Sequence, residues 1–144
     1  MRIVRLGLLA MIAVTVLALY ACDRVTPSPD TPLPAPVPEG VALVVDEATG
    51  PVSVRTGQTF AVTLSSNFDW QVQTLPDGLE LLGTKTGPTT TAQRDRGETG
   101  GASWFVFHLR AVAPGEGALV LTEAPGWEPE KPMRTLAIPV QVEP

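Results

Sequence analysis

The clearest hydrophobic pattern in the chain is an alternation of apolar and polar side chains over residues 104–111. One face would carry Phe105, Phe107 and Leu109, and the other would carry Trp104, Val106, His108 and Arg110. A period of two residues is typical of a half-buried β-strand. A turn rich in proline and glycine follows at residues 114–117, and residues 118–122 predict a return strand. Residues 104–122 are therefore predicted to form a hairpin.

Further short strands are predicted at residues 41–45, 52–55, 59–64, 70–74, 79–83 and 134–142. Turn residues separate them, and no segment shows the 3.6-residue period of a helix. Short strands at this spacing predict an all-β fold, an immunoglobulin-like β-sandwich. Trp70 suits the core of such a sandwich. Pro139 places its part of the last strand at a sheet edge or a bulge, because proline cannot donate to a ladder.

Two loops flank the predicted hairpin and should emerge at the same end of it. Residues 97–103 precede the hairpin, and residues 123–129 follow it. A polar run at residues 84–99 leads into the first of these loops and has no apolar periodicity. A loop of this length in a small domain is either functional or disordered, and both interpretations stay open.

Residues 1–21 have the pattern of a cleaved lipoprotein signal peptide. Two arginines give a positive start, and the apolar run that follows is shorter than the roughly 20 residues of a membrane-spanning helix. The segment ends in Leu-Tyr-Ala before Cys22, the one cysteine of the chain, which is similar to a bacterial lipobox. We therefore predict lipidation of Cys22 and a membrane-anchored lipoprotein of the bacterial cell envelope, facing the periplasm or the exterior. Plain secretion with an unpaired thiol is the alternative.

Residues 22–39 are predicted to be a lipidated cysteine followed by a proline-rich linker. Six prolines between residues 26 and 39 favour an extended polyproline II conformation, which suits a spacer between membrane and domain. A proline-rich docking ligand is the alternative. The folded domain is then predicted to span residues 40–144, and nothing in the sequence demands more than a monomer.

Composition and charge argue against several classes of function. The formal net charge of −5 offers no basic patch for nucleic acid. The single histidine, His108, lies in a predicted strand as an exposed residue with no carboxylate or nucleophile nearby in sequence, and Ser103 is not in a nucleophile elbow. One histidine and one cysteine cannot make a familiar zinc site. We therefore predict no enzyme activity, no metal site and no cofactor.

Three short motifs stand at predicted loops: Ser-Asn-Phe-Asp-Trp at residues 66–70, Gly-Glu-Thr-Gly-Gly at 97–101 and Ala-Pro-Gly-Trp at 124–127. Together they resemble the inhibitory loops of the chagasin-like inhibitors of papain-like cysteine proteases. In that family the first loop carries Asn-Pro-Thr-Thr-Gly-aromatic-x-Trp, the middle loop Gly-x-Gly-Gly, and the last loop Arg-Pro-Trp. The Pro-Thr-Thr-Gly segment and the arginine are absent here.

The resemblance implies an immunoglobulin-like sandwich that inhibits papain-like cysteine proteases reversibly, by occluding the active-site cleft with three loops. The protease-binding residues that it implies are Asn67, Phe68, Gly97, Glu98, Thr99, Gly100, Gly101, Pro125, Gly126 and Trp127. For Trp127, binding and covering the core both remain open. The alternative function is a lipid-anchored, immunoglobulin-like binding or structural module of the envelope, without protease inhibition.

Overall fold

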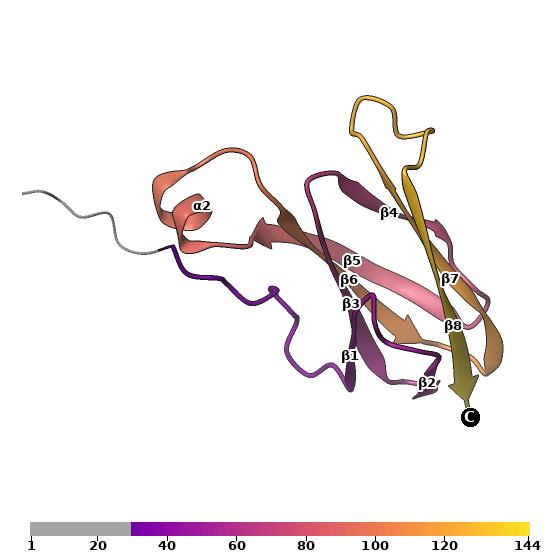
Figure 1. The fold of residues 1–144 in the computed structure, drawn as a ribbon. Coiled ribbons are helices and arrows are strands. Elements are labelled where there is room, and N and C mark those ends of the chain that lie inside the picture. Colours follow the sequence, from indigo (N-terminus) through magenta and orange to yellow (C-terminus); the bar gives the residue numbers. More distant parts are fainter. Residues whose placement is uncertain (1–29) are drawn as a thin grey trace, which may run out of the picture.

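Two four-stranded sheets face each other in the computed structural model, which describes residues 30–144 (Figure 1). The first sheet has the order β1 (Leu43–Val45), β3 (Thr59–Ser66), β6 (Ser103–Ala111) and β5 (Leu79–Pro88). The second has the order β2 (Val52–Arg55), β8 (Arg134–Glu143), β7 (Gly115–Ala124) and β4 (Asp69–Thr74). This arrangement confirms the predicted all-β sandwich. The predicted signal peptide at residues 1–21 and Cys22 lie outside the described residues.

The core lies between the sheets and is made by the inward faces of their strands. The alternation in β6 predicted its share correctly, since Phe105, Phe107 and Leu109 are at most 7% exposed. Strand β3 of the same sheet and strands β7 and β8 of the facing sheet add Phe60, Val62, Leu64, Leu119, Leu121 and Ile138. Trp70 is also buried in this cluster, as predicted. Burying one leucine or phenylalanine side chain contributes roughly 1.5–3 kcal/mol, so these residues dominate the stability of the sandwich.

The hairpin predicted for residues 104–122 is wrong, because β6 and β7 lie in different sheets. β6 pairs with β3 and β5, whereas β7 pairs with β4 and β8. Where the chain crosses between the sheets, the backbone amides of Val112 and Ala113 donate to the carbonyl of Gly78. Alternation reports which face of a strand is buried but not which strand is its neighbour, and the error follows from that.

The edges of the second sheet agree with the sequence. Strand β2 is an edge strand and pairs in parallel with residues 140–143 of β8. Pro139 comes just before this pairing begins, in the part of β8 that has β7 as its one neighbour among the described strands. The proline therefore lies where one side of the strand is an edge, as predicted. β1 pairs in parallel with β3 in the first sheet.

The polar run at residues 84–99 is not a loop throughout. β5 continues to Pro88 along β6, and the helix α2 (Thr91–Arg96) follows it. Thr90 caps the helix by accepting a hydrogen bond from Gln93 N at 3.3 Å, and Gly97 ends it in the left-handed conformation. Backbone pairing needs no apolar side chains, and six residues are too few to show a helical period. Among residues 30–144, no helix is long and apolar enough to cross a membrane.

The described part of the proline-rich linker is extended, but it lies against the domain instead of standing free as a spacer. The amide of Leu33 donates to Thr89 O at 2.7 Å, and Trp104 Nε1 donates to Leu33 O at 2.9 Å. The half-buried residues of this segment include Leu33, Ala35 and Val37, whereas Pro34 and Pro36 are exposed. Apolar residues at alternate positions let an extended segment bury one side. The division of the chain between residues 39 and 40 stays a prediction.

The outer face of β6 is correspondingly less exposed than its alternation predicts. Val106 is fully buried there, and His108 is half-buried instead of exposed. Pro38 lines a hollow together with both residues, so the linker shields part of this face. His108 Nε2 is buried and has no hydrogen-bond partner among the described residues.

Candidate functional site

Three connections emerge at one end of the sandwich, here termed the loop end (Figure 1). The first loop, residues 67–68, joins β3 to β4; the middle loop, residues 89–102, joins β5 to β6; and the last loop, residues 125–133, joins β7 to β8. They share an end because each is the return between strands that run toward it and strands that run back. All ten residues predicted to bind a protease lie in these three loops.

The first and last loops meet through an aromatic pair at their tips. The rings of Phe68 and Trp127 pack edge to face, with centroids 6.3 Å apart and planes at 71°. Such a pair contributes about 0.5–1.5 kcal/mol beyond its buried area. Trp127 is nevertheless 77% exposed, so it does not cover the core, and Asn67 beside Phe68 is exposed as well. Trp127 is therefore an apolar projection into solvent that packs on the half-buried Phe68.

Two further residues of the last loop bring it close to the first. A side chain at Gly126 would place its Cβ 2.8 Å from Asp69 Oδ2, so glycine permits the close approach of the two loops. Pro125 is buried, and its carbonyl accepts a hydrogen bond from Glu128 N at 2.9 Å. Pro125 therefore supports the turn beneath Trp127 and offers no surface of its own, although the sequence placed it among the binding residues.

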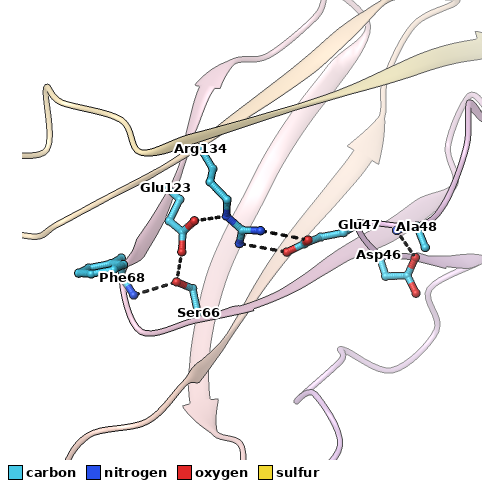
Figure 2. A network of polar contacts seen from close by, with 7 residues as sticks. All are labelled: Asp46, Glu47, Ala48, Ser66, Phe68, Glu123 and Arg134. Atoms are coloured by element: carbon cyan, nitrogen blue, oxygen red, sulfur yellow. Dashed lines mark hydrogen bonds and ion pairs between the residues drawn. The ribbon is translucent and has the colours of Figure 1, made fainter.

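A polar network closes the end of the core directly beneath these two loops (Figure 2). Ser66 Oγ donates to one carboxylate oxygen of Glu123 and accepts from the amide of Phe68 at 2.8 Å. Arg134 Nε donates to the other oxygen of Glu123, and its two terminal nitrogens each donate to Glu47 at 3.3 Å. Since Ser66 belongs to one sheet and Glu123 to the other, the network joins the sheets and fixes the backbone at Phe68.

Hydrogen bonds and the charge of Arg134 keep Glu123 ionised in spite of its burial. Burial raises the pKa of Glu123, but hydrogen bonds from Arg134 and Ser66 outweigh that effect and hold the pKa below its ordinary value. The hydrogen bond to Glu123 in turn raises the pKa of Arg134. The guanidinium also lies 5.0 Å from the centre of the Trp70 ring, a cation–π contact. The indole Nε1 of Trp70 is buried and has no partner among residues 30–144.

The middle loop is exposed, and its conformation depends on glycine. Gly97, Gly100 and Gly101 have φ angles of +64°, +86° and +86°, a region that residues with a Cβ rarely adopt. Glu98 and Thr99 lie exposed between them, and Glu98 pairs with Arg96 at 2.9 Å. Because the three glycines have no side chains, a partner can approach their backbone closely.

One side chain, that of Gln93, spans the base of the middle loop. Its Nε2 donates to Gly100 O at 3.1 Å and to Ala102 O at 3.0 Å, and its Oε1 accepts from Thr89 N at 2.7 Å. The carboxamide therefore ties the start of the loop to its end. A Cβ at Gly101 would lie 3.1 Å from the same Nε2, so the fit around Gln93 is tight.

The structure thus brings together the first and last loops, whereas the middle loop with α2 stands apart from them at the same end (Figure 1). Among the described residues, no group of three or more His, Cys, Asp or Glu side chains could hold a metal ion. His108 is on β6, away from the loops. The loops offer a surface for binding.

Several residues that support the site were missed in the sequence. Gln93 had a detectable signal, because Thr90-x-x-Gln93 matches the pattern of a helix capping box. Glu123 and Arg134 had none, since charged residues at strand ends are usually solvated, and nothing local indicates that these two face inward. Only the pairing of β7 with β8 places them opposite each other.

Comparisons with known proteins agree with this geometry. A family model described as chagasin family peptidase inhibitor I42 matches residues 53–142. No curated protein matches the sequence. The crystal structure of the cysteine protease inhibitor EhICP2 from Entamoeba histolytica is 17% identical, with a TM-score of 0.54 over 72% of this chain and 100% of that one. The solution structure of amebosin is 20% identical, with a TM-score of 0.56 over 70% and 97%.

A weaker likeness, with a TM-score of 0.43 and 14% identity, links 74% of the chain to 94% of PbICP-C, whose structure was solved in complex with falcipain-2. At identities this low, likeness to the first two solved structures shows the shared fold and nothing finer. The match of the family model covers more than half of the chain and includes the first loop, the middle loop and the last loop.

Proposed function

The chain belongs to the chagasin family of peptidase inhibitors, and from that premise we propose that its loop end occludes the active-site cleft of papain-like cysteine proteases. The protein is an inhibitor and not an enzyme, as its family indicates. The observation that carries the proposal is the exposed Trp127, packed on the half-buried Phe68, at the same end as a middle loop with three left-handed glycines. The aromatic residues and the glycines lie at the same end of the sandwich, where a concave surface of a partner could contact them.

Each loop would make a different contact in such a cleft. The indole of Trp127 supplies a large apolar contact surface. Tryptophan is one of the residue types enriched among interface hot spots. At residues 97–101 the bare backbone can approach a cleft wall closely and pair with an extended segment of the enzyme. Contacts of this kind need no covalent step, so the inhibition is reversible.

The supports beneath the loops bear on affinity. Ordering a flexible loop on binding costs conformational entropy, and loops that are already held in place lose less of it on association. The amide of Phe68 is fixed by Ser66, and Gln93 fixes the base of the middle loop. The loop end is therefore preorganised for a rigid cleft.

The test is titration of the full-length chain, solubilised in a mild detergent, against papain and a cathepsin-L-like enzyme while hydrolysis of a peptide substrate is followed. We expect competitive, reversible inhibition that Trp127→Ala weakens and that Val112→Ala, a truncation of an exposed residue in the β6–β7 connection, leaves unchanged. Folded protein that fails to inhibit either enzyme at micromolar concentration contradicts the proposal and favours a binding or structural module.

We also propose that the protein is a lipoprotein, anchored by lipid on Cys22 to a membrane of the bacterial cell envelope and facing the periplasm or the exterior. The support is the sequence of residues 1–22 alone, which the structure does not describe. Mass spectrometry of the protein from bacterial membranes should find an acylated cysteine at the N-terminus. Cys22→Ser should then move the protein out of the membrane fraction; unchanged fractionation contradicts the anchor.

A further inference from the structure

Residues 30–38, termed here the N-terminal brace, contact α2, the helix in the first half of the middle loop. Asp30 Oδ1 accepts from Ala92 N at 3.0 Å and from Thr91 Oγ1 at 3.2 Å. Thr91 N donates to Thr31 O at 2.9 Å, and Thr31 N donates back to Thr91 Oγ1 at 3.0 Å. Two of the first three amide groups of α2 are therefore satisfied by the brace, and Gln93 N is satisfied by the N-cap Thr90.

This support matters because α2 is too short to stand alone. It has six residues, and isolated helices shorter than about 12–15 residues are marginal in water. The amides of a first helical turn have no partner within their helix and need one outside it. In this protein a segment about sixty positions earlier in the chain provides two of those partners.

The brace is itself held on the sandwich. Leu33 is bonded on both sides, through its amide to Thr89 and through its carbonyl to Trp104 of β6. Pro32 bridges to Thr90, and the ring of Pro36 lies 3.2 Å from the place where a Cβ on Gly87 would be. Glycine at residue 87 lets the brace cross β5 at close range. The brace thus connects α2 to β5 and β6 of the first sheet.

Gln93 carries this support from the helix to the middle loop. It lies in the first turn of α2, directly after the two residues that the brace holds, and its carboxamide bonds Gly100 and Ala102. Movement of the first turn would move both anchor points at the base of the loop. The segment that ends at these anchor points, residues 97–102, contains three left-handed glycines and few other restraints.

We propose that the N-terminal brace, acting through Asp30 and the positioning residue Gln93, holds the middle loop in its protease-binding conformation. The inference rests on the proposed inhibition of cysteine proteases. When the brace is released, the loop samples other conformations, and the rate of association falls with the fraction of molecules that remain competent to bind. The rate of dissociation changes little, because the contacts in the finished complex are the same.

The experiment has two readouts on the full-length chain in detergent. NMR order parameters of residues 97–102 report the loop in the free protein, where rigid backbone gives about 0.85 and flexible backbone less than about 0.6. Association rates with papain report its effect on inhibition. We expect Asp30→Ala and Gln93→Ala each to lower the order parameters and to slow association by roughly three- to tenfold, the size of one lost capping contact.

Matched controls distinguish loss of the brace from the general effects of removing a surface charge or truncating a surface glutamine. Asp77→Ala removes an exposed carboxylate in the turn between β4 and β5, and Gln141→Ala truncates an exposed glutamine on β8; both should behave as wild type. Asp30→Asn keeps the acceptor oxygen and should recover most of the order that Asp30→Ala loses.

Unchanged order parameters in Asp30→Ala and Gln93→Ala would contradict the proposal that the brace holds the middle loop, whatever the result of the inhibition assay. Lower order parameters with an unchanged association rate overturn its role in binding. If wild type does not inhibit papain at all, the proposed function fails, and the order parameters still decide separately whether the brace holds the loop.

Discussion

The loop end is supported in two different ways. The first and last loops rest on Ser66, Glu123 and Arg134, which belong to the strands that also build the core. The middle loop, which contains α2, rests on residues 30–38, a segment that precedes the first strand. One support is part of the sandwich, whereas the other is added to its surface. Damage to the first support should therefore lower both stability and binding, whereas damage to the second should lower binding alone.

The largest effect is expected at the tip of the core-supported pair. Trp127→Ala removes an exposed indole that the fold does not need, and truncating a hot-spot residue costs about 2–4 kcal/mol of binding, or roughly 30- to 1,000-fold in the inhibition constant. The melting temperature should fall by only about a few degrees, since the edge-to-face contact with Phe68 is lost but the core is untouched. A loss smaller than threefold, measured by titration against papain, would show that the pair is not the main contact.

Glu123→Gln tests whether the first support couples stability to binding. The substitution removes the charge that Arg134 and Ser66 share, at a site where Glu123 is 5% exposed. Arg134 is half exposed, so solvent screening limits the loss to about 1–2 kcal/mol of unfolding free energy. Urea denaturation should show this loss, and inhibition should weaken with it.

The control for Glu123→Gln is Glu116→Gln, an exposed glutamate on the same strand. It should alter neither stability nor inhibition. Weaker inhibition by Glu123→Gln with full stability would mean that the network positions Phe68 but does not hold the sheets together.

Gly101→Ala tests the second support from the side of the loop. At a φ of +86° an alanine is strained, and its Cβ would press on Gln93 Nε2 from 3.1 Å. Inhibition should weaken by roughly fivefold, about 1 kcal/mol, while the denaturation midpoint stays within error. Gly50→Ala is the matched control, since that residue is not left-handed and has open space around it. A clear drop in global stability would show that the middle loop is not independent of the sandwich.

Acid should weaken the two supports differently, and this is the smallest expected effect. The pKa of Glu123 in the folded protein lies below the ordinary value of 4.5. Its contribution is therefore complete above that value and is lost as the pH falls through the folded pKa. Wild type should lose stability below about pH 4.5 more steeply than Glu123→Gln, by less than about 1 kcal/mol. Parallel curves from pH 6 to pH 3 would exclude this coupling.

Asp30 also has a lowered pKa, chiefly through its hydrogen bond from the amide of Ala92. Because it restrains a surface helix and not the core, acid should free the middle loop without lowering the energy of global unfolding.

The sequence predicts the sandwich and the positions of its loops because these depend on local patterns. The alternation in β6 identifies its buried face, and turn residues mark where strands end. It does not predict that β6 and β7 separate into different sheets, since partners are chosen by packing over the whole fold. The motifs at residues 66–70, 97–101 and 124–127 indicate the candidate site, but they do not predict the contact between Phe68 and Trp127.

The supports are harder to predict than the loops they hold. Prolines at every second position predict a spacer, and they obscure the alternation of Leu33, Ala35 and Val37 that docks it. Glu123 and Arg134 look like solvated strand ends until β7 pairs with β8. In both cases the contacts depend on the tertiary fold. In the proline-rich segment, moreover, the composition is typical of a free linker and conceals the docking pattern.

The connectivity also has a kinetic consequence. The β5–β6 and β7–β8 pairs are the two that join consecutive strands, and their connections are the middle and last loops. Of the other pairings, β1 with β3 joins nearby segments through an intervening strand, and the remaining three bring together distant segments, as when Val52 meets Val140. Short closures cost less chain entropy than long ones, so these two hairpins should form early during folding. Substitutions that retune the loops for a protease will therefore also alter how fast the chain reaches its native state.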